Sequence, residues 1–231
     1  MQLCSSDLSH GRAIVIMGVS GSGKSTIGKL LAESIGCSFL DADDFHSEEN
    51  TEKMKQGIPL TDSDRLPWLE TLRDTLIDYV LRGKIVVLAC SALKPSYRQL
   101  LRTADFQRML ETQREDEENQ EETNLMSHSL KSLSRESKEL YDNQHLKGNR
   151  ESHGPSHRVT FLLLNGPIEL FASRLKERFQ QGTHFMPPSL LLSQIDALAV
   201  SEKEDDVILL DARLSPEEVV QYAKELVCQN A

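Results

Sequence analysis

The sequence lacks the features that mark secreted, zinc-binding or membrane-spanning proteins. Its four cysteines are scattered and form no CxxC pair, which favours free thiols in a reducing compartment over a disulfide framework or a zinc site. The N-terminal residues MQLCSSDLSHGR contain no apolar core of a secretory signal, and no apolar run approaches the roughly 20 residues of a membrane helix. We therefore expect a soluble, cytoplasmic protein with no membrane partner.

The sequence also lacks an excess of positive charge. The 231 residues include 26 Lys and Arg against 36 Asp and Glu, which gives a formal net charge of −10. A general nucleic-acid binder presents a basic face to the phosphate backbone, so this balance argues against a nucleic-acid partner. The length suits one α/β domain with a sizeable core.

Short apolar runs alternate along the chain with segments of helical periodicity. Runs rich in β-branched residues predict strands, and apolar residues at helical spacing predict helices. The expected strands are 12–17, 37–40, 85–89, 159–164 and 207–210. The expected helices are 25–35, 47–56, 63–82, 95–110, 168–179, 188–198 and one from 215 onward. This alternation predicts a single three-layer α/β domain, 1–231, with a central parallel sheet covered by helices on both faces.

One segment interrupts the alternation. Between 111 and 157 the composition turns to Glu, Ser, Asn, Gln and Lys, and the stretch 115–122 reads EDEENQEE. Such a segment has too few apolar residues to offset the entropy of folding. We predict a disordered or loosely helical insertion between two strands of one domain, with a regulatory or partner-binding arm as the alternative.

The clearest chemical signature is the glycine-rich segment GVSGSGKS at 18–25. It matches GxxxxGK[ST], the P-loop pattern, and lies between a predicted strand and a predicted helix. Glycines let the backbone turn its N–H groups inward around anionic oxygens, and the following helix adds the positive end of its dipole. The Lys24 ammonium can reach the β- and γ-phosphates of ATP, and the Ser25 hydroxyl can ligate Mg²⁺. The residues expected to bind ATP here are Gly18, Val19, Ser20, Gly21, Ser22, Gly23, Lys24, Ser25 and Thr26.

The class of P-loop protein follows from the segments around the loop. A GTPase would carry the strings NKxD and DxxG, and neither occurs. Large ATPases usually end an apolar strand with an acidic residue for magnesium, whereas the corresponding strand here reads IVVLACSAL. The carboxylates follow the second strand instead, in FLDADDFH at 39–46. This placement favours kinases that present an acceptor hydroxyl opposite the P-loop.

Several blocks resemble those of gluconokinases, small P-loop kinases similar in fold to shikimate kinase and adenylate kinase. The blocks are MGVSGSGKSTIG, DADDFH, KMKQGIPLTDSDRLPWL, VVLACSALKPSYR and HFMPP. The resemblance implies an enzyme that phosphorylates D-gluconate to 6-phosphogluconate with ATP and Mg²⁺, and it also implies a homodimer. The insertion departs from the family, which usually has a much shorter connection there. Two alternatives stay open: a kinase of this fold for another small acceptor, such as shikimate or a nucleoside monophosphate, and a non-catalytic nucleotide-binding regulator.

The acidic residues after the second strand are candidates for the reaction itself. Phosphoryl transfer is catalysed mostly by positioning and charge neutralisation, and a carboxylate beside the acceptor can take the hydroxyl proton. We expect Asp43 to be this base and to hold a gluconate hydroxyl. Asp41, two residues earlier on the same side of an extended chain, is expected to help bind Mg²⁺ through water. Asp44 is expected to be structural, and His46 either contacts the substrate polyol or is an ordinary loop histidine.

Cationic residues complete the expected site. A sugar acid favours arginine, whose fork grips a carboxylate in two places. Arg65 resembles the substrate arginine of related kinases, with an ordinary surface arginine as the alternative, and Trp68 is expected in the core. Ser91, at the carboxyl end of a strand, is a candidate substrate ligand, with Lys94 and Arg98 nearby.

The run RLKERFQQGTHFMPP at 174–188 is expected to be a lid. Clustered cations around a glycine are typical of a segment that closes on phosphates and excludes water. Arg178 is expected to act on the transferring phosphoryl group, and Arg174 to stack near adenine. His184 is a candidate substrate ligand.

Overall fold

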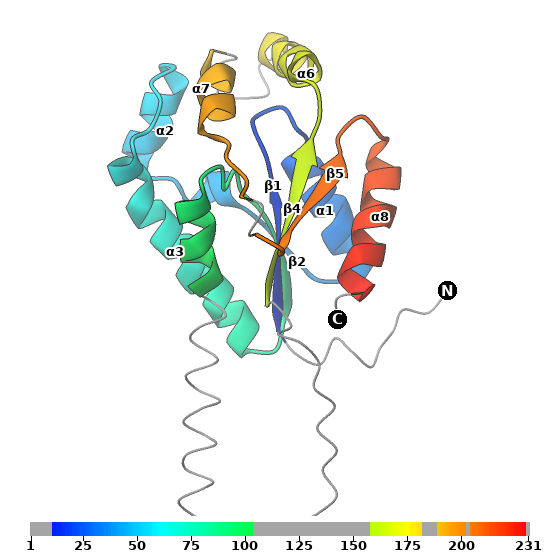
Figure 1. Ribbon diagram of the computed structural model, residues 1–231. Helices are drawn as coiled ribbons and strands as arrows, with labels where there is room; N and C mark the ends of the chain where they lie inside the picture. Colours follow the sequence, from blue (N-terminus) through cyan, green and yellow to red (C-terminus); the bar gives the residue numbers. More distant parts are fainter. Residues whose placement is uncertain (1–10, 104–157, 182–188, 202–203, 230–231) are drawn as a thin grey trace, which may run out of the picture. The chain divides into compact units, whose positions relative to one another are not determined.

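The computed structural model confirms a parallel sheet with helices on both faces (Figure 1). It describes residues 11–103, 158–181, 189–201 and 204–229, and the predicted insertion 111–157 lies outside them. All neighbouring strands are parallel, in the order β2-β3-β1-β4-β5. The strands are β1 (Arg12–Met17), β2 (Ser38–Asp41), β3 (Ile85–Ala89), β4 (Val159–Asn165) and β5 (Val207–Asp211).

The helices form two layers that cover the faces of the sheet and a third group beyond the carboxyl ends of its strands. Helices α1 (Lys24–Ile35) and α8 (Pro216–Gln229) cover one face, and α3 (Asp62–Leu81) and helical residues 95–103 cover the other (Figure 1). Beyond the carboxyl ends of the strands lie α2 (Glu48–Lys55), α6 (Ile168–Gln180) and α7 (Leu190–Ala197) (Figure 1). Proteins with open parallel sheets bind their ligands at the carboxyl ends of the strands.

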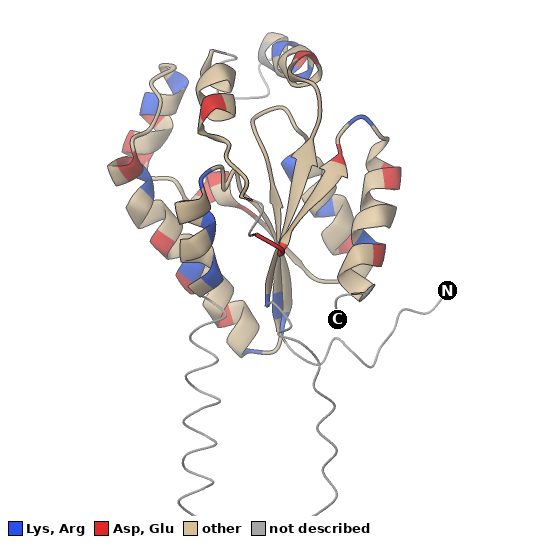
Figure 2. Cartoon of the chain, viewed as in Figure 1, with Lys and Arg blue, Asp and Glu red and all other residues tan. Residues whose placement is uncertain are grey.

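The three inner strands are mostly apolar because both of their faces are buried. Along β1, Val15 and Met17 pack into the cluster on the α3 side, whereas Ile14 and Ile16 pack into the cluster on the α1 side. In Figure 2 the strands carry almost no charge, while Lys, Arg, Asp and Glu lie on the helices and strand ends. The run RAIVIM forms the predicted strand, which is buried and lies at the centre of the sheet.

The observed ends of the described elements lie within two residues of the predicted ones. Gly36, at φ +77°, ends α1, and its N–H donates to the Ala32 carbonyl oxygen at 2.8 Å. Ser47 caps α2, since its hydroxyl accepts from the Asn50 N–H at 3.2 Å. Local capping chemistry thus sets where these helices begin and end.

Two further predictions are tested by the described residues. The described cysteines, Cys37, Cys90 and Cys228, are free thiols, as predicted. None of the helices in the described ranges combines the length and apolar character that crossing a membrane requires.

Candidate active site

The P-loop connects the carboxyl end of β1 to α1. Gly18, Gly21 and Gly23 have φ values of +140°, +80° and +104°, in the left-handed region where only glycine is unstrained. A Cβ on Gly21 would lie 2.6 Å from the Phe171 carbonyl oxygen, so this turn also requires the absence of a side chain. The buried Ser22 hydroxyl oxygen has no hydrogen-bond partner among the residues that the structure describes. The loop therefore has the backbone conformation of an anion-binding nest.

A pocket beside the P-loop brings together most of the predicted catalytic and substrate residues. Its lining includes the predicted Ser20, Gly21, Gly23, Lys24, Ser25, Asp43, Arg65, Ser91 and Arg178. These residues come from the P-loop, the turn after β2, α3, the loop after β3, and α6. We call it the acceptor pocket. Its lining also includes residues for which the sequence predicted no site role or left the role open: His46, Met54, Leu60, Trp68, Leu93 and Gln194.

Lys24 lies where several charges act on one ammonium group. Burial lowers the pKa of Lys24 from its usual value, and the nearby carboxylates of Asp43 and Asp41 partly oppose that shift. The Arg178 guanidinium acts in the same direction as burial. Lys24 Nζ donates to the Val19 carbonyl oxygen of the same loop at 3.1 Å. The structure thus gathers two cations and two carboxylates around the P-loop.

The acidic segment after β2 is a 3₁₀ turn, η1 (Ala42–Phe45). The Asp41 Oδ1 accepts from the Asp43 N–H at 3.2 Å and so caps this turn. The prediction that Asp41 and Asp43 share one side of an extended chain is therefore wrong, because the short Asp41 side chain folds the backbone into a turn. Asp43 still lines the acceptor pocket, whereas Asp44 is exposed and does not.

Hydrogen bonds to neighbouring residues fix the Arg65 side chain in the lining of the acceptor pocket. Its Nη1 donates to the Leu60 carbonyl oxygen at 2.5 Å and to the Tyr97 hydroxyl at 3.4 Å. The Tyr97 hydroxyl in turn donates to Asp62, which Lys94 also binds at 2.6 Å. Within the described part of the chain only Nη1 of Arg65 makes hydrogen bonds, so the rest of its fork is not committed to a protein partner. Lys94 therefore supports Arg65 through Asp62 and does not itself line the pocket.

His46 is a neutral imidazole stacked on Trp68. The ring centroids lie 4.3 Å apart with an interplanar angle of 13°. Burial, with a smaller effect of the Arg65 cation, lowers the pKa of His46 to about 4. Within the described ranges, the buried His46 Nδ1 has no hydrogen-bond partner. Trp68 is buried, as predicted, and its Nε1 donates to the Ala42 carbonyl oxygen at 2.7 Å, which ties the stack to η1.

A second pocket lies on the other side of the P-loop. Ser22, Gly23 and Thr26 line it together with Ala212, Leu214, Pro216 and Val219 near the start of α8. Arg174 crosses it: Nη1 donates to the Ser22 carbonyl oxygen at 3.3 Å and Nη2 to the Ala212 carbonyl oxygen at 3.0 Å. Arg178, one helical turn further along α6, lines both pockets. The first residues of the predicted lid 174–188 thus belong to α6, and 182–188, including His184, lie outside the described residues.

The contact of Gln194 with the P-loop is one that the sequence did not indicate. From α7, its Oε1 accepts from the Ser20 N–H of the P-loop at 2.6 Å. The two residues are 174 positions apart in the chain. No local pattern could have found this contact, because a glutamine in a helical segment is ordinarily a solvent-facing residue.

Comparisons with known proteins identify the family and agree with the fold. The shikimate kinase family model matches residues 20–153. A gluconokinase of Arabidopsis thaliana is 40% identical over 220 residues, which cover 95% of this chain and 94% of that protein. A thermosensitive gluconokinase of Escherichia coli strain K12 is 32% identical and covers 94% of this chain and 88% of its own length. The crystal structure of a gluconokinase from Sinorhizobium meliloti 1021 has a TM-score of 0.61 at 30% identity and covers 95% of this chain and 98% of its own.

Proposed function

Since this chain belongs to the gluconokinase family, within the wider shikimate kinase family, we propose that it transfers the γ-phosphoryl group of ATP to D-gluconate, giving 6-phosphogluconate and ADP. The observation that carries the proposal is the acceptor pocket, in which Lys24 of the P-loop, the Asp43 carboxylate and the Arg65 guanidinium line one cavity. A phosphate cradle, a proton acceptor and a carboxylate clamp are the three groups that phosphorylation of a sugar acid requires.

The second pocket is the proposed place of the adenine ring. It adjoins the P-loop, and apolar residues near the start of α8 form its far wall. The planar Arg174 guanidinium, fixed by two carbonyl oxygens, offers a flat surface for stacking. A nucleotide lying across both pockets would bring its γ-phosphate toward Arg178, which lines both. We assign Arg178 to the charge that develops on the transferring group.

The residues around the P-loop fit a magnesium ion held mainly by phosphate oxygens. Mg²⁺ usually binds one or two protein oxygens, keeps several waters and takes the rest of its ligands from the phosphates. Ser25 supplies a hydroxyl at the start of α1, and the Asp41 carboxylate acts electrostatically on neighbouring Lys24. Among the described residues no group of three or more His, Cys, Asp or Glu could hold a metal alone. When bound, Mg²⁺ would neutralise charge on the phosphates.

The acceptor side is assigned to residues from three segments. Arg65 would bind the gluconate carboxylate with the part of its fork that makes no hydrogen bond to the protein. Asp43 would accept the proton of the attacking hydroxyl. The neutral His46 imidazole, with a buried and unpartnered Nδ1, is suited to a sugar hydroxyl, and Ser91 provides a further hydroxyl in the same pocket.

A substrate panel tests the proposed function directly. ADP release should be measured with purified protein, Mg²⁺ and ATP over gluconate, shikimate and several nucleoside monophosphates. Gluconate is expected to be the substrate that gives rapid turnover, because it has both the carboxylate for Arg65 and a free terminal hydroxyl. If shikimate or a nucleoside monophosphate were phosphorylated as rapidly as gluconate, the assignment of gluconate as the acceptor would be wrong. ATP binding without ADP release from any acceptor would favour a non-catalytic regulator.

Replacing Arg65 with alanine is expected to raise the KM for gluconate much more than it lowers kcat. A carboxylate clamp forms in the ground state and the transition state alike, so its loss weakens both equally. A charged hydrogen-bonded contact is worth roughly 1.5–3 kcal/mol, which corresponds to a change of about 10- to 150-fold. The measurement is steady-state kinetics at saturating ATP and Mg²⁺.

Two controls make the Arg65 test specific. Arg73→Ala removes an arginine of the same helix that pairs with its neighbour Asp74 and does not line the pocket, so its KM should match the unmodified protein. A neutral polyol of the same chain length lacks the carboxylate and should be insensitive to Arg65→Ala. If Arg65→Ala raised the KM for the polyol as much as the KM for gluconate, Arg65 would have a structural role and would not bind the carboxylate.

A further inference from the structure

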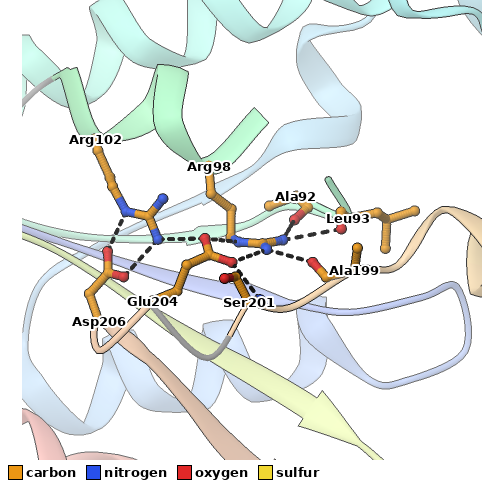
Figure 3. Close-up of polar contacts among 8 residues, drawn as sticks. All are labelled: Ala92, Leu93, Arg98, Arg102, Ala199, Ser201, Glu204 and Asp206. Carbon is orange, nitrogen blue, oxygen red and sulfur yellow. Dashed lines mark hydrogen bonds and ion pairs between the residues drawn. The ribbon is translucent and has the colours of Figure 1, made fainter. Parts of the chain in front are cut away.

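Two arginines and two carboxylates form a cluster whose members line neither of the two pockets (Figure 3). Arg98 and Arg102 come from the helical residues 95–103, and Glu204 and Asp206 precede β5. The Arg98 side chain is fully buried, and the Glu204 side chain is 9% exposed. We refer to these four residues as the arginine–carboxylate cluster.

All five N–H donors of Arg98 are engaged (Figure 3). Its Nε and Nη2 donate to the two oxygens of Glu204, at 2.9 and 2.5 Å. Its Nη1 donates to the carbonyl oxygens of Ala92 and Leu93, at 2.7 and 3.1 Å. Its Nη2 also donates to the Ala199 carbonyl oxygen at 2.6 Å. Because the guanidinium is planar and rigid, it fixes three chain segments relative to one another.

The first of these segments is the loop after β3, which forms part of the acceptor pocket. Ser91 and Leu93 line the pocket, and the Ser91 carbonyl oxygen accepts from the Gly18 N–H of the P-loop at 3.3 Å. Ala92, between them, has a φ of +43°, which costs a non-glycine residue of order 1–3 kcal/mol. The surrounding contacts must hold this loop in place, and Arg98 binds two of its carbonyl groups.

The second segment continues from α7. The Ala199 N–H donates to the Leu93 carbonyl oxygen at 3.0 Å, beside the bond from Arg98 to Ala199. Five residues earlier, Gln194 on α7 accepts from the P-loop N–H of Ser20. The contacts therefore form a closed circuit that runs from the P-loop through the pocket loop, Arg98 and α7 back to the P-loop.

We infer that Arg98 is a positioning residue for phosphoryl transfer, which holds the pocket loop and α7 in the arrangement that the acceptor needs beside the P-loop. The inference rests on the proposed function. Stability alone does not account for this residue, since apolar side chains often replace a buried ion pair without loss of stability. An apolar side chain cannot bind the three carbonyl groups that Arg98 binds.

Arg102 provides a matched control within the same cluster. It lies one helical turn after Arg98 and also binds Glu204, at 2.7 Å, and Asp206. Its guanidinium lies over the Phe161 ring, 5.0 Å from the centroid. It makes no hydrogen bond to a pocket-lining residue in the described part of the chain. Its loss should therefore disturb the cluster without moving the acceptor pocket.

The experiment compares Arg98→Lys with Arg102→Lys in the full chain. Lysine keeps the charge but cannot bridge several segments with a planar fork. Both variants are expected to lower the unfolding midpoint. Arg98→Lys alone should lower kcat/KM for gluconate by on the order of tenfold or more, because small displacements of bound groups strongly reduce turnover. Its dissociation constant for ATP without acceptor should stay close to the unmodified value.

The kinetics of the two single variants separate a positioning role from a purely structural one. Arg98→Lys with unmodified kinetics, or Arg102→Lys with the same loss of kcat/KM, would overturn it. If Arg98→Lys does not fold, the double variant Arg98→Met with Glu204→Leu removes the buried charges together; a folded double variant should show the same loss. If the double variant were fully active, or if it also failed to fold, we would conclude that Arg98 contributes to folding and does not position the acceptor pocket. Absence of gluconate turnover in the unmodified protein would overturn the proposed function instead.

Discussion

Replacing Lys24 with methionine is expected to lower kcat by at least about 10²-fold. Methionine keeps an unbranched stem of similar length but removes the ammonium group that would follow the β- and γ-phosphates into the transition state. The ammonium is already partly desolvated in the site, since burial lowers its pKa. A charge in such surroundings interacts with a phosphate more strongly than it would in water.

The Lys24 test needs a measure of folding and a lysine control. Lys29→Met changes an exposed lysine of the same helix, whose Nζ lies 5.7 Å from the centroid of the Phe39 ring, and its kcat should be unchanged. Thermal unfolding without ligand should show that Lys24→Met is folded. Mg²⁺-ATP should raise the unfolding midpoint of Lys24→Met less than that of the unmodified protein. Near-normal turnover in folded Lys24→Met would contradict the P-loop assignment.

The order of strands and helices could be predicted because it depends on local patterns. A strand buried on both faces reads as a nearly continuous apolar run, and β1 shows this in the five residues that follow Arg12, AIVIM. Helix ends were predictable where a single side chain or glycine sets them, as with Ser47 and Gly36. The 3₁₀ turn after β2 was missed because Asp41 can either extend a strand or cap a turn, and only the fold decides between them.

The candidate site could be predicted only in part, for a related reason. The P-loop is one continuous segment, so its conformation and its chemistry follow from neighbouring residues. The clustering of Asp43 and Arg65 could be expected because ligands gather at the carboxyl ends of parallel strands. The contacts of Arg98 with Glu204 and of Gln194 with Ser20 join residues 106 and 174 positions apart. Periodicity carries no information about such pairs, so Arg98 was placed only near the site.

Replacing Asp43 with asparagine is expected to lower kcat by on the order of 10²-fold, with a smaller change in the KM for gluconate. Asparagine keeps the shape and can still bind a hydroxyl, but it cannot accept the hydroxyl proton. Asp44→Asn is the matched control, because this carboxylate lies in the same 3₁₀ turn, is exposed, and does not line the acceptor pocket. Its kinetics should equal those of the unmodified protein.

A magnesium titration separates the role of Asp43 from that of Asp41. Both carboxylates act electrostatically on Lys24, so a loss of activity alone would not distinguish a base from a metal ligand. Asp41→Asn is expected to raise the concentration of Mg²⁺ needed for half-maximal turnover and to recover at high Mg²⁺, since it would lose only a water-mediated contact. The defect of Asp43→Asn should persist at saturating Mg²⁺, because no added cation replaces the proton acceptor. Recovery of Asp43→Asn with Mg²⁺ would make Asp43 a metal ligand and leave the hydroxyl proton to another acceptor, such as solvent or the phosphate itself.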